Sequence, residues 1–259
     1  MSIVKIENSK CLIVNDMHQD IRWFKRILKQ ETDFDYLIFN GDWFDTHRKD
    51  DQISSIKDVC EFIHRLINEF GDKFIMTVGN HDTPYYYAWY HYKKRYSSLE
   101  TLPYPCSGFN NSKAKIIAKH LNEEVIKRAH LVLSVNGWLV SHAGVSPYLW
   151  PYSEEGEGSD EKSLNKLLEQ SEGAWENFRF MTDTPFLYCG PGRGGYDRYS
   201  GVTWGDWDLE FYDGLPQPQL VGHTVGDEPR QKGGSWCIDC AQTTYAILHE
   251  GGELEIKKI

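Results

Sequence analysis

The chain has 259 residues, of which 40% are hydrophobic and 14% aromatic, and it carries a formal net charge of -10. This length and composition allow a sizeable core, and no linker-like segment divides the chain, so we expect a single domain over 1–259. The negative charge opposes general nucleic-acid binding and favours action at a specific small site. Few cysteines, several within apolar runs, predict a reducing, cytoplasmic setting, and no stretch is apolar for long enough to predict a membrane span.

The first half of the chain alternates short apolar runs with helical patterns. The apolar runs predict strands at 3–6, 11–15, 36–40 and 73–78. Between them, apolar residues recur at helical spacing over 21–28 and 53–70. This β, α, β, α, β order predicts a sheet covered by helices.

The second half continues with helices and then turns to strands. Apolar spacing predicts a helix through Ile117 and Val125, a hairpin at Asn136-Gly137, and a further helix over 164–178. The C-terminal part predicts successive strands, at 219–223, 235–239, 244–249 and 253–258. The intervening segment 182–218 is rich in Gly, Pro, Tyr and Trp without a period, which is typical of a functional loop covering a site.

Side chains with metal-ligand chemistry follow five of the predicted strands. They are Asp16 and His18 in "NDMH", Asp42 and Asp45 in "NGDWFD", Asn80, His81 and Asp82 in "GNHD", His142 in "SHAG", and His223 in "GHT". In a sheet with βα connections, the carboxyl ends of the strands converge on one crevice. Carboxylate, amide and imidazole groups without thiolate suit ions such as Mn²⁺, Fe or Zn²⁺.

Each motif alone also has an ordinary structural interpretation. Asp16 could open a helix, Asp42 could form a turn, and His142 and His223 could be satisfied core histidines. A glycine stands beside four of the five motifs, where it would allow close backbone approach. The combination therefore favours a shared site over separate structural roles.

The ordered motifs "DMH", "GDWFD", "GNHD", "SHAG" and "GHT" resemble the calcineurin-like metallophosphoesterase superfamily, over a span from Asp16 to Asp239. The resemblance implies an α/β (α+β) fold, a metallophosphoesterase-type β-sandwich of mixed sheets flanked by helices. Val225 stands where many members have a second His after "GH". With "HAGVSP" and "CIDCA", this is similar to the branch of serine/threonine protein phosphatases and symmetrical dinucleoside-tetraphosphate hydrolases. Thr46 departs from that branch, which usually has Arg there, while Asp82 matches the tetraphosphate hydrolases.

The resemblance also implies a site with two divalent ions, Mn, Fe or Zn. It assigns Asp16 and His18 to one ion, Asn80, His142 and His223 to the other, and Asp42 to a bridging position. Such a pair of ions polarises the phosphoryl oxygens and generates a hydroxide that attacks phosphorus in line.

The remaining assignments concern proton transfer and substrate binding. By the same resemblance, His81 would donate a proton to the leaving oxygen, and Asp82 would hold the His81 ring in the right tautomer. Arg48, Arg193 and Arg198 are candidates for binding phosphate, although an exposed arginine is usually a solvated surface residue.

The leading interpretation is a metal-dependent phosphoesterase that hydrolyses phosphomonoesters of a phosphoprotein or a small phosphorylated metabolite. An alternative is a hydrolase of dinucleoside polyphosphates or other nucleotides, which Asp82 and the aromatic content favour. A third is a non-catalytic scaffold that binds a partner through a tyrosine-rich surface, although a scaffold has no need for converging metal ligands.

Other features leave alternatives open. The segment 84–96, "PYYYAWYHYKKRY", is either a stacking platform for a base or peptide or an amphipathic helix that packs its rings on the body. Trp204 and Trp207 either line the site or pack in the interior. Cys237 and Cys240 lack a second ligand pair, which favours packed strand cysteines over a zinc site.

Overall fold

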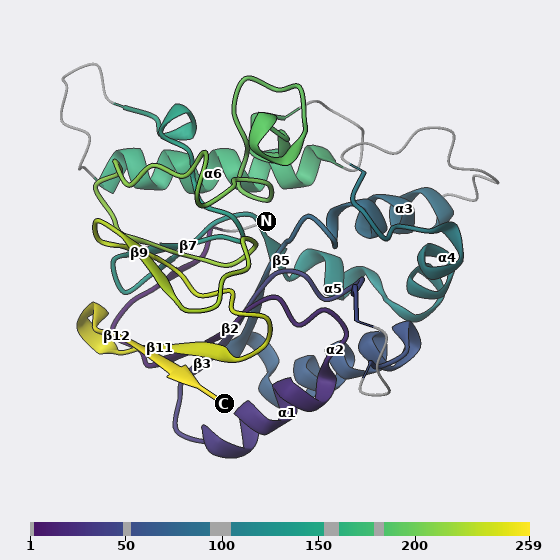
Figure 1. Cartoon of the computed structure of the whole chain (residues 1–259). Coiled ribbons are helices and arrows are strands. Elements are labelled where there is room, and N and C mark those ends of the chain that lie inside the picture. Colours follow the sequence, from purple (N-terminus) through teal and green to yellow (C-terminus); the bar gives the residue numbers. More distant parts are fainter. Residues whose placement is uncertain (1–2, 49–52, 94–104, 153–160, 179–183) are drawn as a thin grey trace.

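The computed structural model describes residues 3–48, 53–93, 105–152, 161–178 and 184–259, and these form two mixed six-stranded sheets packed against each other (Figure 1). The first sheet contains, in spatial order, β1 (Lys5–Ile6), β6 (Leu133–Val135), β7 (Trp138–Val140), β8 (Gln219–Val221), β10 (Ser235–Cys237) and β9 (Arg230–Lys232). The second contains β12 (Leu254–Lys258), β11 (Thr244–Leu248), β2 (Cys11–Val14), β3 (Tyr36–Asn40), β4 (Phe74–Thr77) and β5 (Ala129–His130). The predicted sandwich of mixed sheets flanked by helices is confirmed.

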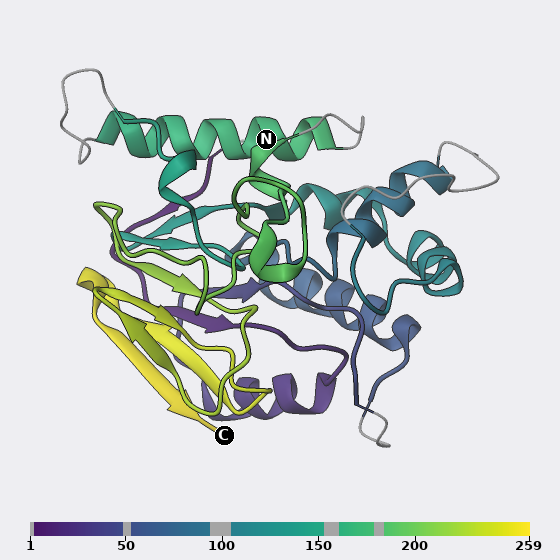
Figure 2. The same cartoon turned by 45° about the horizontal axis from the view of Figure 1, so that its top comes forward.

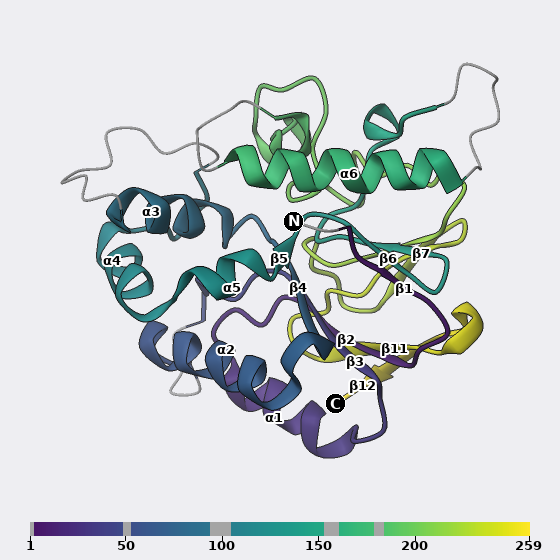
Figure 3. The ribbon, with the colours of Figure 1, turned by 180° about the vertical axis from the view of Figure 1, so that it is seen from behind.

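Helices cover the outer sides of both sheets (Figures 1 and 3). The second sheet packs against α1 (Ile21–Gln30) and α2 (Ile56–Phe70), while α6 (Glu161–Phe178) runs along the first sheet. A group of three further helices gathers at one end: α3 (Thr83–Lys93), α4 (Asn111–His120) and α5 (Glu123–Lys127). Short 3-10 turns occupy Gly71–Lys73, Pro147–Leu149, Pro185–Leu187, Pro191–Arg193 and Glu250–Gly252.

Alternate residues of the central strands enter two different hydrophobic clusters. Ile13 and Ile38 pack between the sheets with residues of the first sheet such as Val140. Leu12 and Phe39 face the other way and pack against the helices. Because β2, β3 and β4 are parallel and covered on both faces, they read in the sequence as continuous apolar runs rather than alternating ones.

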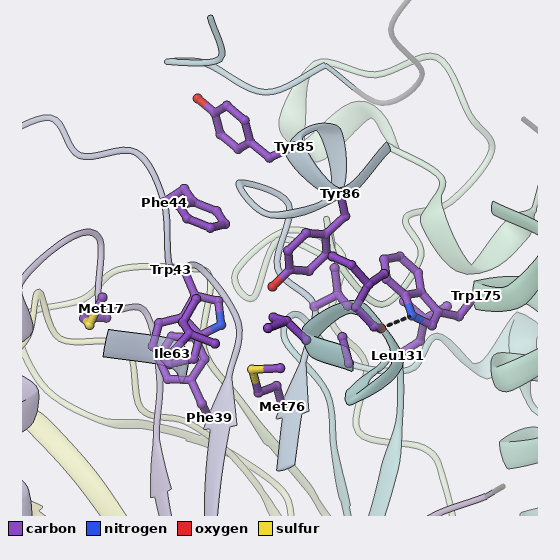
Figure 4. Close-up of a cluster of buried hydrophobic side chains, with 14 of the residues drawn as sticks. Met17, Phe39, Trp43, Phe44, Ile63, Met76, Tyr85, Tyr86, Leu131 and Trp175 are labelled. Carbon is purple, nitrogen blue, oxygen red and sulfur yellow. Dashed lines mark hydrogen bonds between the residues drawn. The ribbon is translucent and has the colours of Figure 1, made fainter. Parts of the chain in front are cut away.

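The tyrosine-rich run forms helix α3, whose rings pack onto the body. Tyr85, Tyr86 and Tyr87 are buried. Figure 4 shows Tyr85 beside Phe44, and the Tyr86 ring lies edge-on to the Trp175 ring with 6.0 Å between the centroids. For the part of the run within α3, the packing interpretation is therefore confirmed, and residues 94–96 lie outside the described part of the chain.

The structure differs from the sequence predictions at two places in the second half. The helix predicted through Ile117 and Val125 is two helices, because Leu121 is extended and the Asn122 side chain caps α5 by accepting from the Val125 N–H. The four strands predicted in the C-terminal part are confirmed as β8, β10, β11 and β12, which divide between the two sheets, but the chain forms a further strand between β8 and β10, β9, that was not predicted. The predicted hairpin at Asn136-Gly137 is confirmed as β6 and β7.

The segment 184–218 contains only short 3-10 turns and crosses in front of the sheets below α6 (Figure 2). It carries Cys189, the thiol with most solvent access among six free cysteines; the other five, including Cys237 and Cys240, are buried. No helix within the described residues combines the length and apolar character needed to cross a bilayer.

Candidate metal centre

The polar motifs meet at the carboxyl ends of strands from both sheets. The parallel register of β2, β3 and β4 brings Asp16, Asp42 and Asn80 to one edge of the second sheet. His142 follows β7 and His223 follows β8, which are parallel neighbours in the first sheet. A crevice of about 660 Å³ opens at this point, and its lining includes His18, Asp42, Asn80, His81, His223 and Asp239.

The Asp42 carboxylate lies between two imidazoles. Its Oδ2 is 3.6 Å from His18 Nε2 and 3.4 Å from His142 Nε2. The Nδ1 atoms of both rings face backbone carbonyls, at 2.9 Å from Asp45 O for His18 and 3.0 Å from Asn40 O for His142. These carbonyls fix the two rings so that each presents Nε2 toward Asp42.

Asn80, Asp16 and His223 complete the cluster. Asn80 Oδ1 lies 3.2 Å from His142 Nε2, and the His223 backbone N–H donates to Asp16 Oδ1 at 3.1 Å. His223 Nε2 is a buried nitrogen with no hydrogen-bond partner among the described residues. Such an orphaned ring nitrogen is unusual in a folded protein and suits a metal ligand.

Several site residues hold left-handed backbone conformations that side chains other than glycine rarely adopt. The φ angles are 47° at Asp16, 45° at His18, 63° at Asp42, 58° at Asp45 and 66° at His223. Such conformations cost energy, persist only where surrounding contacts enforce them, and cluster at functional sites.

Two of the predicted glycines permit the close approach expected of them. A Cβ at Gly79 would lie 2.0 Å from Asp42 Oδ1, and one at Gly222 would lie 2.0 Å from Asp16 Oδ2. Any larger residue at either position would displace a carboxylate of the site.

The buried charges of the site are strongly coupled. Burial alone would lower the pKa of His142, but the carboxylates of Asp42 and Asp16 raise it to about 10. Burial raises the pKa of Asp42, yet the imidazoles around it, His142 first, bring it below the usual range. Burial and Asp239 raise the pKa of Asp16 well above its ordinary value, whereas burial and His142 lower that of His223.

The residues present fit two divalent cations. Asp16, His18 and Asp42 form one group of converging ligand atoms, Asp42, His142 and His223 form another, and the two groups share Asp42. The His223 Nε2 atom without a partner could bind a cation, and a cation would stabilise the carboxylates that are buried close together at this point. All six predicted ligands are therefore brought together, and their assignment to particular ions stays a prediction.

The predicted contact between Asp82 and the His81 ring is wrong. Asp82 accepts hydrogen bonds from the backbone N–H groups of Asp42, Trp43 and Gly79, at 2.8, 2.9 and 3.0 Å. The His81 ring instead places Nδ1 3.2 Å from Asp45 Oδ2. Both Asp82 oxygens accept hydrogen bonds from the turns that carry the ligands, so the Asp82 carboxylate stabilises the backbone of the site. Asp45, not Asp82, lies where its carboxylate can orient the His81 ring.

The three candidate arginines occupy different places. Arg193 lines the crevice and is held by Asp206, with Nε 2.9 Å from Oδ2, and by Thr224, with Nη2 2.7 Å from Oγ1. Arg48 also lines it and pairs with Asp20 at 2.6 Å. Arg198 lies over the ring of Tyr148 and lines a neighbouring cavity instead.

The two candidate tryptophans also occupy different places. Trp204 lines the crevice with its ring edge-on to His223 at 6.1 Å, as the first interpretation predicted. Trp207 is buried and stacks on Phe211 at 4.2 Å between ring centroids, which is a packing role.

Sequence analysis left some residues of the site without a role. Asp45 stood within a recognised motif, but its contact with His81 depends on the turn after β3. Asp239 lines the crevice after β10, and the signal was present in "CIDC" because a carboxylate there also follows an apolar strand. Gln242, which donates to the Asp16 carbonyl at 2.7 Å, had no such signal.

The two-sheet fold and its strand-end ligands define a metallophosphoesterase-type hydrolase. The sequence matches the calcineurin-like phosphoesterase family over residues 9–227. The chain therefore belongs to this family. No curated protein matches it closely enough to count as a relative.

Solved structures with the same fold include phosphatases of several kinds. A cold-active protein-tyrosine phosphatase of a psychrophile, Shewanella sp., is 14% identical with a TM-score of 0.57, covering 99% of this chain and 82% of that one. A proposed diadenosine tetraphosphatase is 14% identical with a TM-score of 0.51, covering 99% and 97%. A protein serine/threonine phosphatase from Saccharomyces cerevisiae is 13% identical with a TM-score of 0.51, covering 99% and 83%. At these identities, the similarity shows the fold.

Asp82→Asn should lower stability rather than act on proton transfer. Asparagine keeps only one carboxyl-type acceptor and turns an NH₂ group toward backbone N–H donors, so we expect a loss of about 2–4 kcal/mol in the free energy of unfolding, measured by urea denaturation. Asp33→Asn, at a side chain that is 93% exposed, is the control and should change it by less than about 0.5 kcal/mol. Equal effects of the two substitutions would contradict the structural role of Asp82.

Binding of Mn²⁺ should release protons. With the pKa of His142 raised to about 10, its ring is protonated at neutral pH in the metal-free protein and must lose a proton to bind an ion. Affinity should therefore rise with pH up to about 10. Calorimetric titrations at pH 7 in two buffers of different ionisation enthalpy should give different heats, and equal heats would show that no proton is released.

Proposed function

We propose that this hydrolase cleaves phosphomonoesters, carried on a phosphoprotein or a small phosphorylated metabolite, in a metal-dependent reaction. The observation that carries the proposal is the Asp42 carboxylate between His18 and His142, with the His81 ring on the same crevice. This arrangement supplies a shared ligand for two cations next to a proton donor. It supports hydrolysis without a covalent intermediate.

The proposed ligands are Asp16 and His18 for one ion, Asn80, His142 and His223 for the other, and Asp42 for both. The mixed oxygen and nitrogen donors suit Mn, Fe or Zn. When bound, the two ions would supply Lewis-acid charge to the phosphoryl oxygens and an activated water as nucleophile. The chain itself contributes the orientation of the ligands, through the carbonyls of Asn40 and Asp45.

The proposed general acid is His81. Because Asp45 Oδ2 accepts from Nδ1 at 3.2 Å, Nε2 on the opposite edge of the ring is the atom available to a leaving oxygen in the crevice. The His81 backbone N–H also donates to Asp42 Oδ1 at 2.9 Å, which ties the acid to the central carboxylate. In this proposal Asp45 takes the orienting role that sequence reasoning gave to Asp82.

Two arginines are proposed to meet the phosphate. Asp206 and Thr224 hold Arg193 at the crevice, where its guanidinium adds positive charge opposite the carboxylates. Arg48 also lines the crevice, after the motif that carries Asp42. Arg198 is not included, because it lies on Tyr148 in a different cavity.

The domain organisation and the cellular location of the enzyme are further parts of the proposal. We propose a single domain and a cytoplasmic location, and the six free thiols fit a reducing compartment. The expected partner is the phosphorylated substrate. The intact and converging ligand set argues against a non-catalytic scaffold.

The protein with added Mn²⁺ should hydrolyse p-nitrophenyl phosphate. Removing the metal with a chelator should abolish turnover, and Mn²⁺ should restore it. Asp42→Asn removes the shared charge and should lower kcat by about 10²–10⁴-fold. His81→Asn removes the proton donor, so it should lower kcat by about 10²–10⁴-fold for phenyl phosphate, whose leaving group is strongly basic, and by less for p-nitrophenyl phosphate. The matched control for Asp42→Asn is Asp33→Asn, which should retain full activity because Asp33 is exposed and pairs with Lys10. The proposal is wrong if the wild type shows no metal-dependent turnover.

A second candidate function, hydrolysis of dinucleoside polyphosphates or nucleotides, is favoured by a neighbouring cavity of about 480 Å³. It begins at Ala143, directly after the proposed ligand His142, and its wall includes Tyr148 stacked on Tyr199 with ring centroids 4.9 Å apart. An aromatic pair beside a phosphate site suits a nucleobase.

The two candidate functions can be distinguished by comparing their substrates. A nucleotide hydrolase should turn over diadenosine tetraphosphate with higher kcat/KM than a phosphopeptide, and Tyr148→Ala should raise KM for that nucleotide by roughly 10-fold because about 1–3 kcal/mol of stacking is lost. The same variant should leave p-nitrophenyl phosphate turnover unchanged. Tyr196→Ala, at a fully exposed tyrosine, is the control. Preference for the phosphopeptide would favour the first candidate.

A further inference from the structure

The Asp45 carboxylate divides its two oxygens between different partners. Oδ2 faces His81 Nδ1 at 3.2 Å, and the Cys106 thiol, a weak donor, lies 3.6 Å from the same oxygen. Oδ1 accepts a hydrogen bond from the Tyr85 hydroxyl at 2.7 Å and pairs with the Lys113 ammonium. The side chain is only 3% exposed, so these protein groups rather than water determine how the carboxylate is turned.

Donors at Oδ1 matter because rotation about the last bond of an aspartate side chain is soft. No strong rotamer preference fixes the plane of the carboxylate. Two donors that hold Oδ1 in place therefore also fix Oδ2, and with it the direction of the His81 ring. Without them the buried Asp45 could turn away from Nδ1.

Both donors come from the helices at the end of the molecule, not from the strand-end motifs. Tyr85 belongs to α3, and its ring packs edge-on against Phe44 at 5.4 Å with the hydroxyl pointing away from the hydrophobic cluster (Figure 4). Lys113 lies in the first turn of α4, whose N-cap Asn110 accepts from the Lys113 N–H at 2.9 Å. The two helices pack against each other.

The loop before α4 holds the two donors together. The Gly108 carbonyl accepts from the Lys113 ammonium at 3.2 Å and lies 3.3 Å from the Tyr85 hydroxyl oxygen, whose single proton is donated to Asp45. Gly108 has a φ of 90°, and a Cβ there would come within 3.1 Å of Asp45 Cγ. The loop also forms part of the crevice lining at Pro105 and Ser107, so the same segment borders the site.

We propose that Lys113 and Tyr85 are positioning residues for proton donation, which act through Asp45 to direct His81 Nε2 at the leaving oxygen. The inference rests on the proposed phosphomonoester hydrolysis and extends it to residues outside the family motifs. Proton donation matters in proportion to the basicity of the leaving group. Loss of either donor should therefore slow substrates with poor leaving groups and spare those with good ones.

The test compares phenyl phosphate, a poor leaving group, with dinitrophenyl phosphate, a good one, using Mn²⁺-loaded protein. Lys113→Met should lower kcat for phenyl phosphate roughly 10-fold and kcat for dinitrophenyl phosphate less than about twofold, with KM unchanged. Tyr85→Phe should give the same pattern with a smaller loss, because a neutral donor is removed and the ring still fills its place. Lys113→Arg keeps the charge and should restore most of the loss.

The matched control is Lys115→Met, which removes an exposed lysine from the same helix and should behave as wild type. A second readout needs no metal or turnover. In ¹⁵N-histidine NMR spectra of the metal-free protein, the Nδ1 proton of His81 should be protected in wild type and exchange faster in Lys113→Met. Thermal melting of each variant shows whether it is folded.

The outcomes separate this inference from the function on which it rests. Equal losses on both substrates in folded Lys113→Met and Tyr85→Phe, or no loss on either, would overturn the positioning role while leaving the phosphoesterase proposal intact. A wild type without metal-dependent turnover would refute the proposed function and the inference with it. If Lys113→Met does not fold, Tyr85→Phe and the NMR signal decide.

Discussion

The Asp42 carboxylate between His18 and His142 is the interaction on which the site depends. Asp42 follows a strand of one sheet, and His142 follows a strand of the other. Their approach within 3.4 Å therefore requires the two sheets to be packed in register. The apolar layer between the sheets, with Ile13 and Ile38, holds this spacing. The hydrophobic core and the metal ligands therefore depend on the same relative position of the two sheets. A shift of one sheet against the other would separate the ligands before it exposed much apolar surface.

The strained backbone at the site follows from the same constraint. Asp16, Asp42 and His223 leave their strands in left-handed conformations that turn the side chains toward the crevice. Each such conformation costs roughly 1–3 kcal/mol, and hydrogen bonds from neighbouring turns must offset it. At Asp42 this support comes from Asp82, whose carboxylate accepts from the N–H groups of Asp42 and Gly79. A buried carboxylate inside a ligand motif can in this way contribute to the shape of the site without touching the substrate.

The strands, the ligand set and their convergence could be predicted from sequence because the signals are local. Each apolar run ends in a motif, and the parallel arrangement of strands brings the motif ends together. The partner of His81 could not be predicted, since Asp45 and Asp82 both follow strands and only the turn geometry decides which one reaches the ring. Lys113 could not be found either, because its role depends on how α4 packs against α3. The pairing of β9 with β10 was missed because Arg230–Lys232 is a polar, partly exposed strand without an apolar pattern.

The distribution of the thiols leaves one cysteine accessible for attaching a fluorescent label. Burial raises the pKa of Cys11, Cys60 and Cys237 to about 12, so these thiols stay protonated and unreactive at neutral pH. Cys189 is partly exposed, although burial and the carboxylates of Glu210 and Asp197 raise the pKa of its thiol as well, and it lies in the segment that also carries Arg193. A single maleimide fluorophore could therefore be attached beside the crevice without mutating any other cysteine, and its emission would report how this segment responds when a phosphorylated ligand enters.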